Sequence, residues 1–298
     1  MDFWFFAQMP GRTSLGQWHT LTGYLPQFTE MLRVDDAQSR FAAFLQEMKS
    51  FHPDAVLQLG DFAFPQPRFQ ALVDEFNDAA DESLHVIGNH DLDFDHTTGD
   101  CVRAWGMPER YYARTIHGVR YIVLDGNERG SPTHAEHGGY PSYVGPQQQQ
   151  WLETELASSP LPTILLSHQP LAGQSAIDND AEVRAIIAKH QESVLLCLNG
   201  HSHVDQLLEI DGVRYLHINS AAYFWVGGEM RLAKYKDPLF ATLTIDPTAG
   251  EIIVAGVQSN WLNDRPHGVG YFERPDSAPR EVVVPEIRSR TFEVATRR

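Results

Sequence analysis

Residues 53–61 read Pro-Asp-Ala-Val-Leu-Gln-Leu-Gly-Asp, and residues 86–91 read Val-Ile-Gly-Asn-His-Asp. Each stretch is a short apolar run that stops at a glycine and then turns polar, which is typical of a buried strand ending in a loop. Residues 67–80 lie between them and place their apolar side chains on one helical stripe. This strand, helix and strand predict a parallel β-α-β unit with polar side chains at the carboxyl ends of its strands.

The rest of the chain extends this unit into a larger α/β fold. Hairpins follow the alternating strands and helices, which predicts a sandwich of two mixed β-sheets flanked by helices. We assign residues 1–263 to one domain and residues 264–298 to a C-terminal extension whose structure the pattern does not define, with Arg288 and Arg290 in a solvated tail. We expect strands at residues 3–7, 55–59, 85–87, 115–116, 119–124, 163–166, 194–198, 207–210, 213–218, 239–245 and 251–257, and helices at residues 36–50, 67–80, 146–156 and 181–189.

The chain is strongly acidic, because 39 Asp and Glu residues against 23 Lys and Arg residues give a formal net charge of −16. Such a surface repels phosphate backbones, so neither nucleic acid nor an anionic membrane is an expected partner. The opening lacks a basic stretch and no apolar run approaches about 18 residues, so we expect neither a signal peptide nor a membrane span. Cys101 and Cys197 form no metal-binding or disulfide pattern, which makes the cytoplasm the expected location.

Metal-binding side chains follow four of the predicted strands. They are Asp61, Asn89, His168, His201 and His203. Oxygen and imidazole donors in this mixture suit Mn, Fe, Zn or Co better than Ca or Mg. A carboxylate can bridge two cations, and two imidazoles two residues apart can reach neighbouring ions. The pattern predicts a site for one or two transition-metal ions.

The order of these motifs resembles the calcineurin-like metallophosphoesterases. The resemblance rests on Gly-Asp at 60–61, Gly-Asn-His-Asp at 88–91, His168 and Gly-His-Ser-His at 200–203, and it extends over residues 36–257. It implies a metallophosphoesterase domain over most of the chain. It also implies a metal-dependent hydrolase, a phosphatase or phosphodiesterase, that acts on a small phosphomonoester or phosphodiester.

The resemblance also assigns a role to each matching residue. Asp61 is expected to bridge two metal ions. Asn89, His168 and His201 are expected to complete the shell of one ion, and His203 to bind the other. A metal-bound hydroxide is the expected nucleophile.

Two neighbouring residues receive roles that do not involve metal binding. His90 is expected to face the phosphate together with Asn89 and to assist the leaving group by protonating its oxygen or stabilising its charge. Asp91 is expected to hold the loop or a neighbouring histidine. His90 is therefore the candidate catalytic residue.

One motif of the family is missing from the sequence. Its members carry Asp-x-His at the end of the first strand, where this chain offers either Gln8 and Pro10 or Gly11 and Thr13. Neither pair replaces a carboxylate and an imidazole, although Gln8 could offer a neutral oxygen. One metal position keeps its full set of ligands, whereas the other keeps only Asp61 and His203.

Three interpretations of this gap stay open. The second metal binds through substitutes such as Gln8, His19 or the acidic loop 93–96, or the protein works with one metal. Alternatively, catalysis is lost and the chain is a binding protein on the same fold. A nuclease of this fold is a weaker hypothesis, because the chain is acidic and shows no basic stripe.

The organic part of the substrate is the least defined feature. Tyr223 and Trp225 follow the Gly-His-Ser-His motif and are candidates for contacting it, although packing in the core is an equal alternative. A cyclic nucleotide or a glycerophosphodiester would be a suitable small phosphodiester. The oligomeric state and the identity of the metal stay open. The loops expected to define the substrate are residues 93–112, 126–145 and 223–238.

Overall fold

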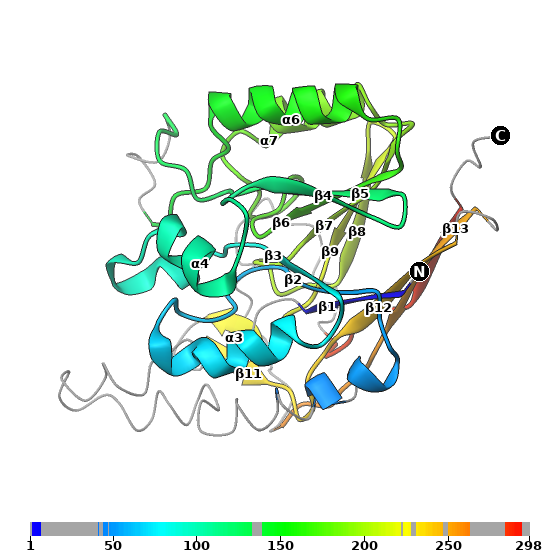
Figure 1. Cartoon of the computed structure of the whole chain (residues 1–298). Helices are drawn as coiled ribbons and strands as arrows, with labels where there is room; N and C mark the ends of the chain where they lie inside the picture. The colour runs from blue at the N-terminus through cyan, green and yellow to red at the C-terminus, as the bar shows by residue number, and fades with distance from the viewer. Residues whose placement is uncertain are drawn as a thin grey trace.

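The computed structural model describes residues 2–6, 41, 44–46, 48–132, 139–221, 223–227, 231–246, 250–262 and 284–293 of the chain. These residues form an α/β fold in which two six-stranded mixed sheets lie face to face between outer helices (Figure 1). The predicted fold class is confirmed. The predicted first helix is helical in its described part, at residues 44–46 and 48–50.

The first sheet has the strand order β14-β13-β12-β1-β2-β3. The strands β1, β2 and β3 are parallel, as the β-α-β pattern predicts, whereas β12, β13 and β14 continue the sheet antiparallel to one another. The bounds are β1 (Asp2–Phe6), β2 (Ala55–Gln58), β3 (Glu82–His85), β12 (Ala241–Asp246), β13 (Glu251–Gly256) and β14 (Arg290–Glu293). A 3-10 turn η2 (Pro67–Phe69) and helix α3 (Gln70–Asn77) connect β2 to β3, and the buried side of α3 packs against this sheet.

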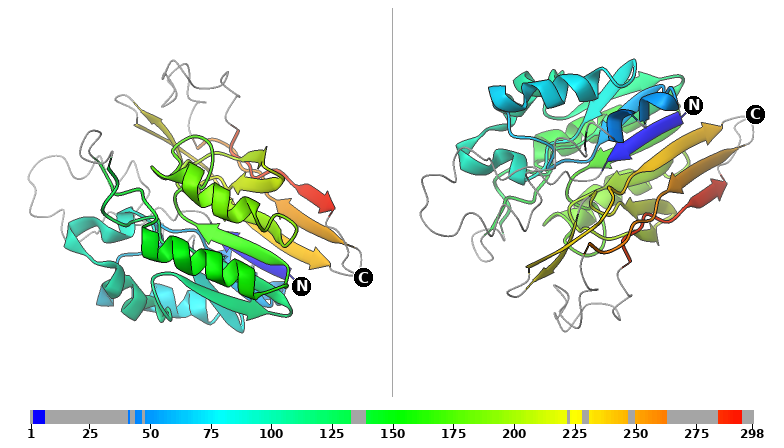
Figure 2. Two further views of the ribbon diagram at one scale, coloured as in Figure 1. Left: turned by 90° about the horizontal axis from the view of Figure 1, so that it is seen from above. Right: turned by 90° about the horizontal axis from the view of Figure 1, so that it is seen from below.

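The second sheet has the strand order β4-β5-β6-β7-β9-β8, with antiparallel pairs at both edges and parallel pairs between them. Helices α6 (Pro146–Ser158) and α7 (Asp180–Ala188) lie side by side across its outer face (Figure 2). The strands are β4 (Tyr112–Ile116), β5 (Val119–Val123), β6 (Thr163–Ser167), β7 (Val194–Asn199), β8 (Gln206–Ile210) and β9 (Val213–His217).

The central strands of the second sheet are buried on both faces. In β5, Tyr121 and Val123 join the core between the two sheets, whereas Ile122 joins the core beneath α6 and α7. Cys197 in β7 lies in the second core and is a buried free thiol, as its apolar surroundings predict. Burial on both faces explains why these strands read as continuous apolar runs in the sequence.

Several elements are absent from the sequence-based assignment. They are helix α4 (Thr98–Trp105), the 3-10 segment η3 (His90–Asp95), and a small hairpin of β10 (Tyr223–Gly227) and β11 (Arg231–Lys234). Thr97 and Asp100 form a capping box at the start of α4, and Gly106 ends it in the left-handed conformation. Only Cys101 and Trp105 of α4 are buried, so its apolar stripe is too sparse to show as a periodic pattern.

The expected solvated tail is wrong for Arg290, whose side chain is only 13% exposed, whereas Arg288 is 51% exposed although it too forms an ion pair. Arg288 Nε lies 2.7 Å from Asp205 Oδ2, and Arg290 binds the same carboxylate with its two nitrogens at 2.8 and 2.6 Å. Asp205 is nearly buried and follows His203 by two residues. The two guanidinium groups offset the cost of desolvating this carboxylate. In addition, β14 pairs with β13, so this part of the tail is attached to the first sheet.

No membrane span is found in the part of the chain that the structure describes. A helix needs about 20 apolar residues to cross a bilayer. Helix α6 has 13 residues, and none of the described helices is both long and apolar enough to cross.

His85 at the end of β3 is a buried neutral imidazole. Its Nε2 donates to Asn77 Oδ1 at 2.7 Å, and its Nδ1 accepts from Gln58 Nε2 at 3.2 Å. Gln58 is fixed in this orientation because its Oε1 accepts the backbone N–H of Gly60. If Nδ1 were protonated, its N–H would face the N–H of Gln58 Nε2, and two donors would repel each other. Burial also disfavours the charged ring and lowers the pKa of His85 to about 3. The rings of Phe62, Phe76 and Trp105 surround it with centroids 5.1 to 5.6 Å away.

We expect His85 to make the fold sensitive to acid. Below pH ~6.5 the unfolded chain protonates this imidazole and the folded chain does not, so the free energy of unfolding falls as the pH drops. At ~1.4 kcal/mol per pH unit, the loss reaches about 3 kcal/mol by pH 4. Denaturant unfolding at pH 7 and pH 4 measures it. The variant His85→Gln should show a weaker pH dependence than the wild type, and an equal dependence would contradict this assignment.

Candidate active site

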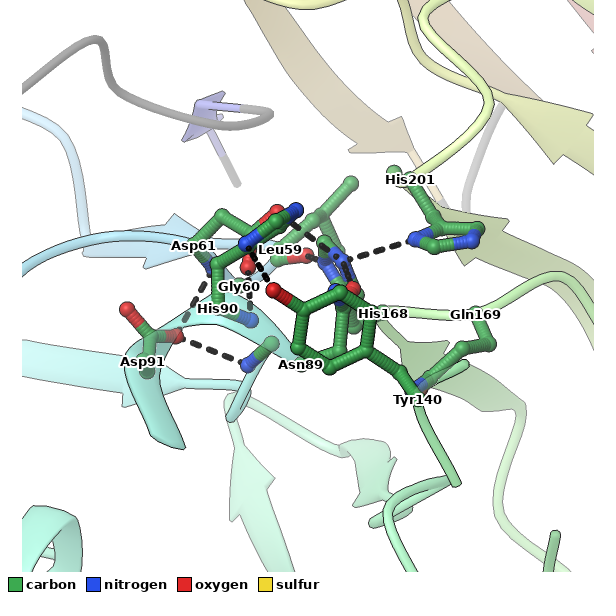
Figure 3. A network of polar contacts seen from close by, with 12 residues as sticks. Leu59, Gly60, Asp61, Asn89, His90, Asp91, Tyr140, His168, Gln169 and His201 are labelled. Carbon is green, nitrogen blue, oxygen red and sulfur yellow. Dashed lines mark hydrogen bonds and ion pairs between the residues drawn. The ribbon is translucent and has the colours of Figure 1, made fainter. Parts of the chain in front are cut away.

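Four of the five predicted ligands meet where the strands of both sheets end. Asp61 follows β2 and Asn89 follows β3, so both come from the first sheet, whereas His168 and His201 follow β6 and β7 of the second sheet. Figure 3 shows these side chains pointing toward one another across the junction of the sheets. Parallel strands present their carboxyl ends at one edge, and this topology brings residues 140 positions apart to one place.

His168 is the centre of this group. Its Nδ1 lies 2.7 Å from the carbonyl oxygen of Leu59, and because a carbonyl only accepts, this nitrogen carries the proton. Nε2 is therefore the nitrogen that faces the site, and it offers a lone pair when the ring is neutral. Around Nε2 lie Asn89 Oδ1 at 3.0 Å, His201 Nδ1 at 3.2 Å and Asp61 Oδ2 at 3.3 Å.

These spacings are compatible with a partly formed metal shell. Ligands that bind one ion at ~2.1 Å and at right angles lie about 3.0 Å from each other. Asn89 Nδ2 is buried with no hydrogen-bond partner among the described residues, and its Oδ1 lies beside His168 Nε2, where both atoms could bind one cation. In the described part of the chain, no three His, Cys, Asp or Glu side chains are arranged to hold an ion by themselves. The ionisable donors instead meet in pairs at His168, and the amide oxygen of Asn89 completes the donor set.

Three of the five predicted ligands have a strained backbone. The φ angles are 56° at Asp61, 63° at His201 and 54° at His203. The left-handed region costs a residue with a side chain roughly 1–2 kcal/mol, so it persists where the surrounding structure enforces it. His203 is also buried. In the loops after β2 and β7, the fold therefore holds these side chains in position at a cost in backbone conformational energy.

Asp91 joins the loops after β2 and β3. Its Oδ2 accepts the backbone N–H of Asp61 and of Gly88, both at 2.8 Å, and the carboxyl group is fully buried. Asp61 Oδ1 in turn accepts the backbone N–H of His90 at 2.9 Å. These bonds agree with the interpretation of Asp91 as the support of the loop.

His90 lies at the edge of the site. Its Nδ1 is 2.9 Å from Asp93 Oδ2, and because a carboxylate only accepts, Nδ1 carries a proton in both charge states of the ring. The proton that His90 can exchange is therefore the one on Nε2. The side chain is 33% exposed, which leaves it accessible to a substrate.

Gly60 is required by the close approach of His168. A Cβ at position 60 would lie 2.4 Å from His168 Nδ1, and the φ of Gly60 is +92°. We expect Gly60→Ala to displace the imidazole and to lower the free energy of unfolding by about 3 kcal/mol. Gly118→Ala is the matched control, because Gly118 also has a positive φ but nothing lies within 4 Å of the added Cβ.

Urea unfolding and a metal-binding titration of both glycine variants check this prediction. The control should lose about 1 kcal/mol of stability through its backbone alone and keep its metal affinity. Equal losses of stability in the two variants, with metal affinity retained in both, would contradict the close contact with His168.

The remaining predicted residues differ in what the structure says of them. Gln8 and His19 lie outside the described residues. The backbone of Tyr223 and Trp225 belongs to β10, but their side chains are not described, so their proposed contact with substrate stays a prediction. In the acidic loop, His96 Nε2 lies 2.8 Å from Gln66 Nε2.

A polar network lies behind His168. Asp125 follows β5, accepts from the side chain of Arg110 at 2.7 Å and from the backbone of Asn127 at 2.9 Å, and is buried. Burial raises the pKa of Asp125, and the guanidinium of Arg110 opposes that rise. Asn127 Oδ1 accepts from Gln169 at 2.7 Å, so the network holds the residue next to His168. Asp125 thus follows a strand as Asp61 does, but it caps the loop instead of facing the ligands around His168.

The model of one protein family, the calcineurin-like phosphoesterases, matches residues 17–205. The chain belongs to this family. A curated relative, a probable cyclic nucleotide phosphodiesterase from a Synechococcus strain, is 30% identical over 201 residues, which is 61% of this chain and 74% of the relative. The match to the family model includes all five predicted ligands and His90.

Two solved structures have the same fold as this phosphoesterase chain. A dimetal phosphatase from Danio rerio is similar with a TM-score of 0.58 and 16% identity, over 86% of this chain and 95% of the other. GAP50, the anchor in the inner membrane complex of Plasmodium, is similar with a TM-score of 0.54 and 12% identity, over 88% and 84%. At such identities the similarity supports the fold alone.

Proposed function

We propose that this protein is a metal-dependent hydrolase of small phosphodiesters. The observation that carries the proposal is the convergence of Asp61, Asn89 and His201 on Nε2 of His168, at distances of 3.0 to 3.3 Å. His90 lies beside this group, and because Nδ1 is held by Asp93, Nε2 is the nitrogen on which it can gain or lose a proton. A metal shell next to a proton donor is the arrangement that phosphate ester hydrolysis needs.

The donor set fits a transition-metal ion such as Mn, Fe, Zn or Co, because it combines carboxylate, amide and imidazole. When bound, one or two such ions would supply an activated water and neutralise charge on the phosphoryl oxygens. The residues that would hold them are Asp61, Asn89, His168, His201 and His203.

The chain's own residues supply orientation and a proton. As a water oxygen bonds to phosphorus and the bond to the leaving oxygen breaks, His90 Nε2 gives its proton to that oxygen. His90 recovers a proton from solvent after the product leaves. Asp93 holds the ring by Nδ1, and Asp91 holds the loops that carry Asp61 and His90.

A small soluble phosphodiester is the favoured substrate class. The relative is a probable cyclic nucleotide phosphodiesterase. The net charge of −16 disfavours long nucleic acids, which bind through their phosphate backbones. A cyclic nucleotide satisfies both conditions, because it is a small diester with a single charge.

Hydrolysis assays on a set of esters test the proposal. The set contains 3′,5′-cyclic AMP, 2′,3′-cyclic AMP, bis-p-nitrophenyl phosphate and p-nitrophenyl phosphate, each with added Mn, Fe, Zn or Co. We expect turnover of at least one cyclic nucleotide, faster than turnover of the monoester. Turnover of the monoester alone would make the protein a phosphatase.

A binding protein without turnover is the second candidate. The observation that favours it is the missing Asp-x-His motif, which removes two ligands from one metal position. It predicts metal or phosphate binding in a calorimetric titration with no hydrolysis of any ester in the set. Hydrolysis that is lost on replacing His90 would rule it out.

A further inference from the structure

Tyr140 is an exposed aromatic residue in direct contact with the proposed proton donor. Its ring centroid lies 4.6 Å from that of His90, at an angle of 60° between the planes (Figure 3). The residue is 45% exposed, although it makes hydrogen bonds. It comes from the loop between β5 and α6, far in sequence from His90.

The hydroxyl of Tyr140 closes a triangle of hydrogen bonds with His90 and Asp93. It donates to Asp93 Oδ1 at 2.7 Å, and its oxygen lies 2.9 Å from His90 Nδ1. Asp93 Oδ2 lies 2.9 Å from the same nitrogen. The proton on Nδ1 thus lies between two oxygen acceptors that are themselves bonded, which restricts rotation of the imidazole about its Cβ–Cγ bond.

The geometry points to Tyr140 as a positioning residue for His90 and, through its ring, as a contact for a flat leaving group. This inference rests on the proposed function. Because the hydroxyl is bound to Asp93 and His90, the ring is held in place, and part of it faces solvent beside the imidazole that would protonate the leaving oxygen. A nucleoside or aryl leaving group could pack on such a fixed ring, whereas a small alkyl group would gain little from it.

The two roles can be separated by choice of substitution and substrate. Tyr140→Phe keeps the ring and removes the hydroxyl, so the imidazole loses one of its two anchors. This should matter most when the leaving oxygen is a basic ribose alkoxide that needs a proton, and least for p-nitrophenolate, which leaves without one. Tyr140→Leu also removes the aromatic surface, so it should weaken binding of nucleoside substrates in particular.

Steady-state kinetics of the full chain with its metal provide the test. We expect Tyr140→Phe to lower kcat about tenfold for a cyclic nucleotide and less than about threefold for bis-p-nitrophenyl phosphate. We expect Tyr140→Leu to raise KM for the cyclic nucleotide but not for a glycerophosphodiester. Tyr111→Phe is the matched control, because Tyr111 packs on Trp151 with centroids 4.8 Å apart and has no contact with His90 among the described interactions.

The outcomes separate this inference from the proposed function. The proposed function stands if the wild type hydrolyses esters and His90→Ala abolishes that activity. In that case, the positioning role is overturned if Tyr140→Phe lowers kcat equally for both substrates or for neither. If Tyr140→Leu changes KM equally for both classes of diester, the leaving-group contact is overturned. Absence of turnover in the wild type with every metal would overturn the function and this inference with it. Thermal unfolding of each variant shows whether a loss of activity comes from misfolding.

Discussion

Asp61→Asn is expected to lower the rate of hydrolysis at least ~100-fold while the chain keeps its fold. Loss of a residue that only supports a metal ligand typically costs about 10- to 100-fold in activity, and Asp61 is itself a proposed ligand. Asparagine tolerates the left-handed backbone that Asp61 adopts. Its Oδ1 can still accept the backbone N–H of His90. What it lacks is the negative charge that would bind and bridge cations. The variant therefore removes the electrostatics of the site and leaves its shape.

Metal content and kcat of this variant should be measured together. We expect bound metal to fall along with activity, while the urea midpoint stays near that of the wild type. Asp211→Asn is the control, because Asp211 also has a positive φ, of 53°, but lies in the exposed turn between β8 and β9. Full activity and full metal content in Asp61→Asn would contradict the role of the carboxylate.

His90→Ala is expected to lower kcat for a cyclic nucleotide by about 10²- to 10⁴-fold, the range that general acid catalysis supplies. The loss should be smaller for bis-p-nitrophenyl phosphate, whose leaving group needs no proton. Metal content should not change, because His90 is bound to Asp93 and is not among the donors around His168. Measuring kcat for both substrates, with elemental analysis of the same sample, checks all three expectations.

Two further histidine variants sharpen this result. His90→Gln can still hydrogen-bond to Asp93 but has no acidic proton, so it should be as impaired as His90→Ala for the cyclic nucleotide. His117→Ala removes an exposed histidine that pairs with Asp54 away from the site, and it should retain activity. If His90→Gln restored turnover of the cyclic nucleotide, the residue would act by hydrogen bonding rather than by proton transfer.

The parallel strands could be predicted because each is an apolar run that ends in Gly and a polar residue. β2 and β3 lie one to three residues from their expected positions. β3 ends at His85 rather than at residue 87, although the backbone N–H of Val86 still donates to the carbonyl of Gln58 in β2. The burial of both faces of β6 and β7 likewise shows directly in their composition.

Elements held by distant contacts could not be predicted. β14 exists because it pairs with β13. Arg290 in β14 and Arg288 just before it bind Asp205, which lies 85 and 83 positions earlier and is a partner that no local pattern reveals. Tyr140 is similar, since nothing in a loop sequence shows that its hydroxyl meets His90 and Asp93. Such contacts depend on where loops meet in space, which hydrophobic periodicity does not define.

The ligands around His168 could be predicted one by one, because each follows a strand. Their mutual geometry could not, since it depends on the tautomer that the carbonyl of Leu59 imposes on His168. A capping role for Asp125 follows from its place at the end of a strand, and its hydrogen bonds with Asn127 agree with it. Its ion pair with Arg110 could not be predicted, since that contact depends on where two loops meet in space.

The most direct test is elemental analysis of protein purified without added metal or chelator, together with hydrolysis of a cyclic nucleotide by the same sample. We expect one or two transition-metal ions bound per chain. We also expect turnover of the cyclic nucleotide that a chelator removes and that added Mn, Fe, Zn or Co restores. A chain that holds metal but hydrolyses no ester under any of these conditions would contradict it, and would identify a binding protein on the phosphoesterase fold.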